Sequence, residues 1–272
     1  MTRPGQGRVL VVAGSDSGGG AGIQADIKTI TVLGGYAATA VTAVTVQNTL
    51  GVSGALPVPL DLIEAQMRAV LDDIGADVIK TGMLGDAATV ARVADLLQIY
   101  GIPAVIDPVM VAKGGHALLA GSAVAAMAER LVPRAALLTP NAPEAAALTG
   151  LAVETTDDLR RAADTLLALG AGAVLMKGGH IPGDRVVDLL ITPAGETRFE
   201  GARIETRHTH GTGCTLASAI AAGLARDRPL IEAVAAAHGY VAQAIRQAPG
   251  LGAGHGPLDH GWPLRGPGHG HG

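Results

Sequence analysis

Short apolar runs alternate with longer amphipathic segments along most of the chain. Most of the short runs are rich in Val, Ile, Leu and Ala, as strands buried on both faces of a parallel sheet are. The longer segments space their apolar residues three or four positions apart, which is typical of surface helices. We predict strands at residues 9–13, 36–46, 52–58, 78–81, 104–108, 137–141, 173–176, 185–191 and 197–202. We predict helices at residues 23–33, 60–73, 86–100, 121–131, 156–169, 216–225 and 230–248, with another beginning near Glu144.

This alternation indicates βαβ units, which place a mostly parallel central sheet between helices on both faces. The fold class that we predict is therefore α/β. No break in composition marks a linker, so we expect one domain over residues 1–260. Residues 261–272 are rich in Gly, Pro and His, and we expect them to form a flexible tail. Four of the nine histidines follow Pro249, but flexible His-Gly runs seldom form a metal site of fixed geometry.

Composition excludes several classes of protein. The 272-residue chain is 48% hydrophobic and carries a formal net charge of −4, so it has no basic excess for a nucleic-acid backbone. Aromatic residues make up only 2%, too few for a base-stacking surface. No apolar run is long enough to span a bilayer or to act as a signal peptide. A single cysteine excludes an internal disulfide. We expect a soluble cytoplasmic protein that binds a small molecule, with no nucleic-acid or membrane partner.

The segment Thr209-His210-Gly211-Thr212-Gly213-Cys214-Thr215 joins a polar strand-like run to a helix-like run. Glycines at such a turn expose backbone N–H groups, and the start of a helix adds partial positive charge, so the pair favours a bound phosphate. Cys214 at this place would lose its proton more easily and could act as a base or a nucleophile. The alternative is a tight turn whose glycines only permit close packing and whose cysteine is a small core residue.

Polar residues also follow the predicted strands, at ends that share one edge of a parallel sheet. Lys177 precedes two glycines and suits a phosphate oxygen, or it is simply a lysine in solvent. Asp107 and Glu144 could hold Mg²⁺ through oxygens and waters. For Glu144 a common alternative is a carboxylate that caps a helix start. For Asp107 a structural role is less expected, because a charge at the end of an apolar strand is costly without a partner.

The Gly-rich loop at residues 14–22 follows the first strand but fits neither standard nucleotide motif. Gly20 stands where the phosphate-binding loop needs Lys, and Ile23 stands at the last glycine position of the dinucleotide motif. Its position at the carboxyl end of a strand favours a substrate wall over a merely flexible turn. Anion donors, a cation, a lysine and a base are together the parts that phosphoryl transfer requires.

The chain resembles the hydroxymethylpyrimidine/phosphomethylpyrimidine kinases of thiamine biosynthesis, within the ribokinase superfamily. The resemblance rests on seven stretches, in order and over nearly the whole chain: Ala13-Gly14-Ser15-Asp16-Ser17-Gly18-Gly19 with Ala21-Gly22-Ile23-Gln24-Ala25-Asp26, Val46-Gln47-Asn48-Thr49, Lys80-Thr81-Gly82-Met83-Leu84, Asp107-Pro108-Val109-Met110, Thr139-Pro140-Asn141-Ala142-Pro143-Glu144, Met176-Lys177-Gly178-Gly179-His180 and the segment at 209–215. It implies a ribokinase-like three-layer sandwich and ATP with Mg²⁺ as the phosphoryl donor. It also implies phosphorylation of 4-amino-5-hydroxymethyl-2-methylpyrimidine and then of its monophosphate.

The resemblance also implies roles for single residues. Those expected to bind the pyrimidine are Gln47 through a hydrogen bond and Gly14, Asp26, Met83 and Val109 as the pocket lining. Those expected to bind phosphates are Lys177, Thr209, Gly211, Thr212 and Gly213, the last three of these as the anion hole. Asp107 and Glu144, with Asn141, would organise Mg²⁺. Cys214 stands where many ribokinase relatives have an aspartate base, and a thiolate beside helix N–H groups is a reasonable substitute.

Some alternatives stay open on the sequence. A pyridoxal/pyridoxine kinase shares the fold and can also have a cysteine at this position, although Gln47 and Met83 favour the pyrimidine. A non-catalytic ligand sensor would bind without turnover. Gly20 extends the glycine run and could loosen the substrate loop, and Lys113 lies in a loop that could be mobile. Members of the family are often homodimers, so the resemblance suggests a homodimer.

Overall fold

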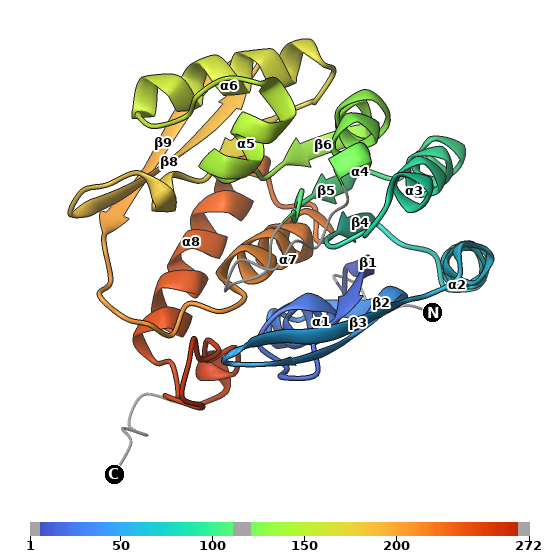
Figure 1. The fold of residues 1–272 in the computed structure, drawn as a ribbon, viewed down its shortest axis with the longest axis horizontal. Coiled ribbons are helices and arrows are strands. Elements are labelled where there is room, and N and C mark those ends of the chain that lie inside the picture. Colours follow the sequence, from blue (N-terminus) through green and yellow to red (C-terminus); the bar gives the residue numbers. More distant parts are fainter. Residues whose placement is uncertain (1–5, 111–120, 266–272) are drawn as a thin grey trace.

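The computed structural model describes residues 6–110 and 121–265, and Figure 1 shows their arrangement. One nine-stranded sheet forms the centre, in the order β3-β2-β1-β4-β5-β6-β7-β8-β9. Neighbouring strands pair in parallel from β2 through β7, whereas β3, β8 and β9 pair antiparallel at the two edges. The strands are β1 Arg8–Ser15, β2 Tyr36–Asn48, β3 Gly51–Pro57, β4 Val78–Thr81, β5 Ala104–Ile106, β6 Ala135–Leu138, β7 Val174–Met176, β8 Arg185–Thr192 and β9 Gly195–Ala202. The predicted α/β class with a mostly parallel sheet is confirmed.

Helices cover both faces of the sheet, which makes three layers (Figure 1). The helices of one face are α2 Leu60–Asp73, α3 Ala87–Tyr100, α4 Gly121–Ala126, α5 Ala142–Thr149 and α6 Thr156–Ala168. Those of the other face are α1 Gly22–Val32, α7 Thr212–Leu224 and α8 Leu230–Arg246. Alternate residues of β1 divide between the two layers, because Leu10 and Val12 pack with the first group and Val9 and Val11 with the second.

Two helix boundaries differ notably from the predicted ones. The α-helix predicted at 121–131 ends at Ala126 and continues as a π-helical turn over Met127–Leu131. The helix predicted to begin at residue 216 begins at Thr212, because Gly211 adopts the left-handed conformation with φ 82° and caps the helix there. The predicted loop that contains Lys113 lies outside the described residues.

The segment after α8 is folded against the rest of the protein. Trp262–Leu264 forms a short 3-10 helix, and the indole N–H of Trp262 donates to the Tyr240 carbonyl. The Tyr240 hydroxyl donates to the carbonyl of His260, which is 4% exposed. These contacts tie Trp262 and His260 to α8 at the start of the segment 261–272, for which a flexible tail stays the prediction. Aromatic and backbone contacts with α8 hold these residues in place. Such contacts cannot be predicted from the Gly and Pro content of the segment.

None of the helices in the described ranges is both long enough and apolar enough to cross a bilayer.

Candidate active site

The carboxyl ends of β1, β4, β5, β6 and β7 meet along one edge of the sheet, and the first turn of α7 lies beside them. Polar side chains from these strand ends converge there as the sequence predicted. A Cβ built on Gly213 would lie 3.2 Å from the Lys177 Nζ and 3.7 Å from an oxygen of Asp107. Lys177, Asp107 and the α7 N-terminus thus share one site, although more than a hundred residues separate the first and last of them in sequence.

The lysine at this site is held between two carboxylates. Lys177 Nζ donates to Asp107 Oδ1 at 2.9 Å and lies 3.7 Å from Glu144 Oε2. Burial alone would lower the pKa of Lys177, but these two carboxylates outweigh burial and raise the pKa, so the side chain is a cation at neutral pH. The alternative of a lysine in solvent is excluded, since its side chain is only 12% exposed.

Glu144 is part of a capping box at the start of α5. Its carboxylate accepts from the Asn141 backbone N–H at 2.8 Å, and its own N–H donates to Asn141 Oδ1 at 2.9 Å. Burial raises the Glu144 pKa to about 7, against the lowering influence of Lys177 and with Asp107 adding to the rise. Glu144 therefore caps α5, as one reading of the sequence predicts, and its carboxylate also lies beside Lys177. Its role toward Mg²⁺ stays a prediction.

The carboxylates of Asp107 and Glu144, which flank the Lys177 ammonium group, are also suitable donors for Mg²⁺. This ion binds oxygen ligands and keeps several waters. Asp107 also accepts from the Thr139 hydroxyl at 3.1 Å, which orients its carboxylate. The side-chain oxygen of Asn141 is already used by the helix cap. Among the described residues, no group of three or more His, Cys, Asp or Glu is placed to hold a metal, so Asp107 and Glu144 would need phosphate oxygens and water to complete a coordination shell.

The turn before α7 depends on close contact between two glycine-containing loops. Gly211 has φ 82°, and a Cβ there would lie 1.8 Å from the Gly20 carbonyl oxygen. A Cβ on Gly20 would lie 2.6 Å from the His210 ring. The idea that Gly20 loosens its loop is therefore wrong, because the lack of a side chain is what allows this packing. The first N–H groups of α7 have no partners within the helix, although that of Thr212 donates to the Thr209 carbonyl at 3.4 Å. A helix start of this kind favours an anion.

Cys214 lies in this first turn and is partly exposed. The side chain is nevertheless shielded from water by the groups packed around it, and this desolvation raises the pKa of the thiol to about 11. Asp26 and Asp107 add to the rise, whereas Lys80 and the Gly22 N–H act in the opposite direction. The sequence suggested that a helix start would make Cys214 more acidic. That expectation is wrong, since desolvation exceeds the favourable interactions.

The predicted pyrimidine-binding residues border the same edge. Gly14 and Met83 face each other, since a Cβ on Gly14 would lie 2.5 Å from the Met83 methyl group. Val109 stands two residues after Asp107 and is half-buried. Asp26 is fully buried and bound by Lys80 and Ser218, so in this arrangement its carboxylate lies beneath the pocket surface. Its predicted contact with the substrate is not supported by this placement.

Gln47 has two neighbours that the sequence did not single out. The Nε2 atom of His210 lies 2.8 Å from Asp16 Oδ2 and 3.2 Å from the Gln47 amide nitrogen. Burial opposes ionisation of Asp16, but hydrogen bonds from His210 and from the Ala21 and Gly18 N–H groups hold its pKa below the usual value. Asp16 follows a buried strand just as Asp107 does, so the same reasoning could have found it.

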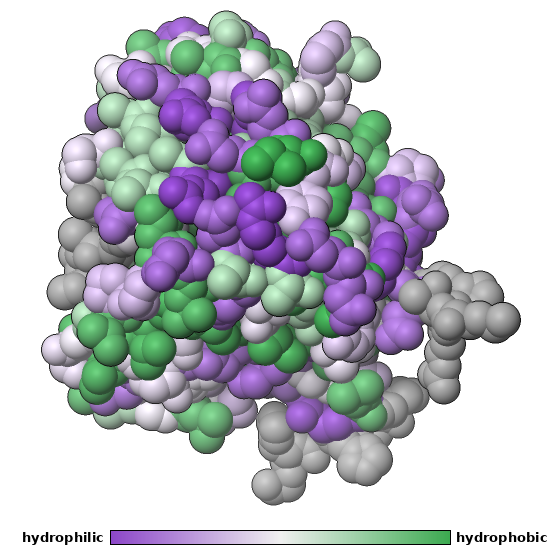
Figure 2. Space-filling view, turned by 90° about the vertical axis from the view of Figure 1, so that its right-hand side faces the viewer, coloured by the Kyte–Doolittle hydropathy of each residue, from purple (hydrophilic) through white to green (hydrophobic). Residues whose placement is uncertain are grey.

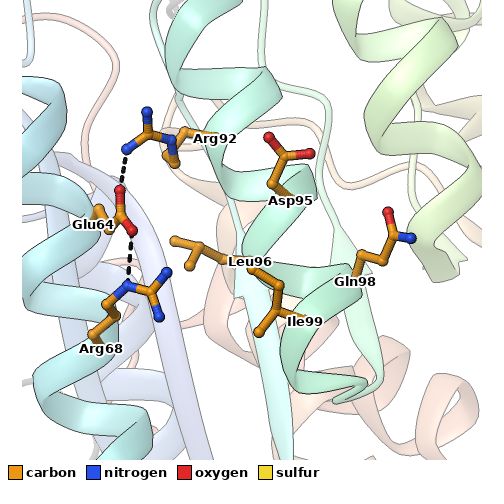
Figure 3. A pocket seen from close by; sticks show the side chains of 7 residues that line it. All are labelled: Glu64, Arg68, Arg92, Asp95, Leu96, Gln98 and Ile99. Atoms are coloured by element: carbon orange, nitrogen blue, oxygen red, sulfur yellow. Dashed lines mark hydrogen bonds and ion pairs between the residues drawn. The ribbon is translucent and has the colours of Figure 1, made fainter.

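A separate hollow of about 610 Å³ lies between α2 and α3, away from the sheet edge (Figure 3). Glu64 pairs there with both Arg68 and Arg92. Asp95 binds Arg130, so the charged groups of the hollow already have partners. Figure 2 views the side of the molecule on which these helices lie and shows hydrophilic side chains spread across it. These observations give no reason to place the active site there.

Comparisons with known proteins agree with this geometry. The sequence model of the phosphomethylpyrimidine kinase family matches residues 16–259. A hydroxymethylpyrimidine/phosphomethylpyrimidine kinase of Streptomyces coelicolor is 53% identical over 256 residues, which cover 94% of this chain and 95% of that protein. A thiamine biosynthesis bifunctional protein of Geobacter sulfurreducens is 52% identical, over 94% of this chain and 52% of that longer protein.

A solved structure extends the comparison to the fold. The ADP complex of Bacillus subtilis pyridoxal kinase superposes with a TM-score of 0.89 at 36% identity, covering 96% of this chain and 100% of that one. Because the likeness covers both chains almost completely, the predicted ribokinase-like three-layer sandwich is confirmed.

Proposed function

The chain belongs to the phosphomethylpyrimidine kinase family, and from this premise we propose that it phosphorylates 4-amino-5-hydroxymethyl-2-methylpyrimidine and then the resulting monophosphate, in thiamine biosynthesis. It is a kinase, and the donor that we propose is ATP with Mg²⁺. The observation that carries the proposal is the meeting of Lys177 and Asp107 with the open N-terminus of α7. These are a cation, a carboxylate and a set of amide donors, which phosphoryl transfer needs at one place.

For the nucleotide, we propose that Lys177 binds the ATP phosphates together with Thr209, Gly211 and Gly213. Lys177 stays charged at neutral pH, and its flexible stem allows the ammonium to turn from Asp107 toward a phosphate oxygen. Asp107 and Glu144 would then hold Mg²⁺, directly or through water, and Asn141 would support Glu144 as the helix cap. When bound, Mg²⁺ would neutralise the negative charge of the phosphates.

For the transfer itself, we propose that Cys214 acts as the base. The hydroxyl oxygen of the substrate forms a bond to the γ-phosphorus while the bond from that phosphorus to the ADP oxygen breaks. The hydroxyl proton passes to the Cys214 thiolate, which becomes a thiol and later returns the proton to solvent. The N–H groups of Gly211, Thr212 and Gly213 would stabilise the negative charge that develops on the transferred group.

For the substrate, we propose that Gln47 hydrogen-bonds the pyrimidine ring, with Gly14, Met83 and Val109 as the pocket lining. His210, supported by Asp16, lies beside the Gln47 amide and restricts its orientation. An amide pairs well with a ring that offers both a donor and an acceptor, as an aminopyrimidine does.

A pyridoxal kinase activity is the second candidate, because a pyridoxal kinase superposes over nearly the whole chain. The experiment is ADP release by the purified full chain with ATP and Mg²⁺, run in parallel with the pyrimidine alcohol and with pyridoxal. Mass spectrometry of the products would follow the pyrimidine monophosphate and diphosphate. We expect a higher kcat/KM with the pyrimidine. A preference for pyridoxal would overturn the assignment, and binding without turnover would identify a sensor.

We also propose that the protein is a homodimer that uses the exposed edge formed by β2 and β3. Val44 of β2 lies opposite Leu56 of β3, and their side chains are 52% and 72% exposed. Val46, also on β2, is 63% exposed. Exposed apolar side chains grouped on two neighbouring strands favour contact with a second copy. Light scattering after gel filtration should give twice the chain mass, and Leu56→Lys should reduce it to one chain mass. A monomeric wild-type protein would refute the proposal.

A further inference from the structure

A fully buried ion pair lies outside the predicted catalytic set. Lys80 of β4 donates to both carboxylate oxygens of Asp26 of α1, each at 3.0 Å, and both side chains are 0% exposed. The Ser218 hydroxyl donates to Asp26 Oδ1 at 2.6 Å. Taking two charges out of water is costly, and well-packed apolar side chains often serve stability as well or better. The pair therefore calls for an explanation other than stability.

The pair contacts α7 at Ser218, one turn beyond Cys214. Ser218 follows Cys214 by four residues, so the two side chains lie on the same face of the helix, one turn apart. A Cβ built on Gly82, at the carboxyl end of β4, would lie 3.2 Å from the Lys80 Nζ. The ammonium group thus reaches the same sheet edge as the predicted base, but from the buried side.

Four charged groups act on Cys214 from the elements around it. Lys80 of β4 favours the thiolate and is the strongest of the interactions that do, whereas Asp26 of α1 and Asp107 after β5 disfavour it. Lys177 after β7 also interacts with the thiol. Burial alone would lower the pKa of Lys80, but Asp26 raises it, so Lys80 remains a cation at neutral pH.

We propose that Lys80 is the counter-charge of the Cys214 thiolate, and that Asp26, anchored by Ser218, holds the ammonium group in place behind the sulfur. Lys80 is then a positioning residue, since it acts on the substrate only through Cys214. The inference rests on the proposed function in one respect, the role of Cys214 as base. The effect of Lys80 on the thiol itself does not depend on that role.

The test uses the single cysteine of the chain. Iodoacetamide is neutral and reacts with the thiolate, so its rate with the full-length ligand-free protein reports the thiolate fraction. The rate would be measured by mass spectrometry from pH 7 to 10 for wild type, Lys80→Met and Asp26→Asn. We expect about tenfold slower alkylation at pH 8 in Lys80→Met, as for a one-unit rise in pKa, and faster alkylation in Asp26→Asn.

Opposite changes in the two variants are the decisive result, because general loosening of the fold would accelerate alkylation in both. Arg8→Met is the matched control, since it removes a cation from the Arg8–Asp77 pair at the other end of β4 and should leave the rate unchanged. If either single variant fails to fold, the charge-balanced Lys80→Met/Asp26→Asn variant should still react more slowly than wild type. Equal rates in all folded variants, the same direction of change in both single variants, or a double variant that reacts as fast as wild type would overturn the inference.

The outcome separates this inference from the proposed function. A full kcat in Cys214→Ala would remove Cys214 as the base while leaving the alkylation result intact. Unchanged alkylation in Lys80→Met, with a large loss of kcat in Cys214→Ala, would keep the base and remove Lys80 as its counter-charge.

Discussion

At the scale of the residue, the protonation of Cys214 controls how the proposed base can work. Burial raises the pKa of the thiol to about 11, so only a small fraction is thiolate at neutral pH before ligands bind. A base is useful only in its deprotonated form. The pH dependence of catalysis should therefore carry the signature of this thiol.

We expect kcat/KM of the wild type to rise with pH from 7 toward 10, because it follows the thiolate fraction of the free enzyme. Cys214→Ala should abolish this rise and lower kcat by about 10² to 10⁴-fold, with little change in the KM of the pyrimidine. Steady-state rates over this pH range would measure both effects. A kcat that survives the substitution would assign proton removal to another group, such as Asp107 or solvent.

Lys177 should act on the nucleotide and not on the pyrimidine. Lys177→Met removes a charged donor, which corresponds to about 1.5–3 kcal/mol or roughly a 10- to 100-fold higher KM for ATP. The KM of the pyrimidine should change by less than about threefold. Lys28→Met is a suitable control, because the Lys28 ammonium donates to the Gly19 carbonyl on an exposed part of the glycine loop. An equal rise for both substrates would indicate general damage to the site.

At the scale of the element, the chain offers two capping boxes of the same kind. Asn141 with Glu144 caps α5 at the active site, and Thr155 with Asp158 caps α6 away from it. We expect Asn141→Ala and Thr155→Ala each to lower the free energy of unfolding by about 1 kcal/mol, as measured by urea denaturation. The Mg²⁺ concentration for half-maximal activity should stay within about twofold of wild type in both. A much higher requirement in Asn141→Ala alone would show that this amide touches the metal.

A second pair separates backbone conformation from close contact. Gly150 and Gly211 both have left-handed backbone, with φ 72° and 82°, but only Gly211 has another backbone atom, the Gly20 carbonyl oxygen, where a Cβ would go. Gly150→Ala should cost about 1–2 kcal/mol of stability and leave activity intact. Gly211→Ala should cost more and lower kcat at least tenfold, because the loop that carries the anion donors must move. Similar thermal melts and activities for both variants would contradict this account.

The same elements show which features of the fold and the site could be predicted from the sequence. Strand ends were predictable because apolar runs are easy to recognise and parallel strands share an edge, which brings Lys177 and Asp107 together. The start of α7 was not predictable, because in the sequence Gly211 looks like part of a loop. Only the structure shows that its left-handed conformation caps the helix. The acidity of Cys214 was misjudged because burial, which raises the pKa of the thiol, is a tertiary property that a position at a helix start does not reveal.

At the scale of the whole molecule, the segment after α8 packs against loops that border the site. Its backbone pairs with the anion loop at His210 and Pro257, and the His255 N–H donates to the Thr49 carbonyl beyond β2. The segment thus joins the pyrimidine side, the phosphate side and α8. At its far end, His260 Nε2 lies 3.0 Å from the Thr215 hydroxyl in the first turn of α7.

His260 makes the packing of this segment sensitive to acid. Burial, with smaller contributions from Lys28 and His210, lowers its pKa to about 4, below the usual value of about 6.5 for an unfolded chain. The unfolded state therefore binds the proton first as pH falls. The stability that neutral His260 provides is present in full above pH 6.5 and is lost between about 6.5 and 4, by no more than about 3 kcal/mol.

We expect the melting temperature of the wild type to fall over this pH range and His260→Gln, whose amide can still donate to Thr215, to show a shallower fall. His255→Gln serves as the control, because His255 is exposed and should keep the wild-type slope. Calorimetry from pH 7 to 4.5 would measure all three. If His260→Gln and wild type lose stability in parallel, acid sensitivity arises elsewhere, and the C-terminal segment is held by its apolar contacts with α8 and not by a neutral imidazole at the phosphate-binding turn.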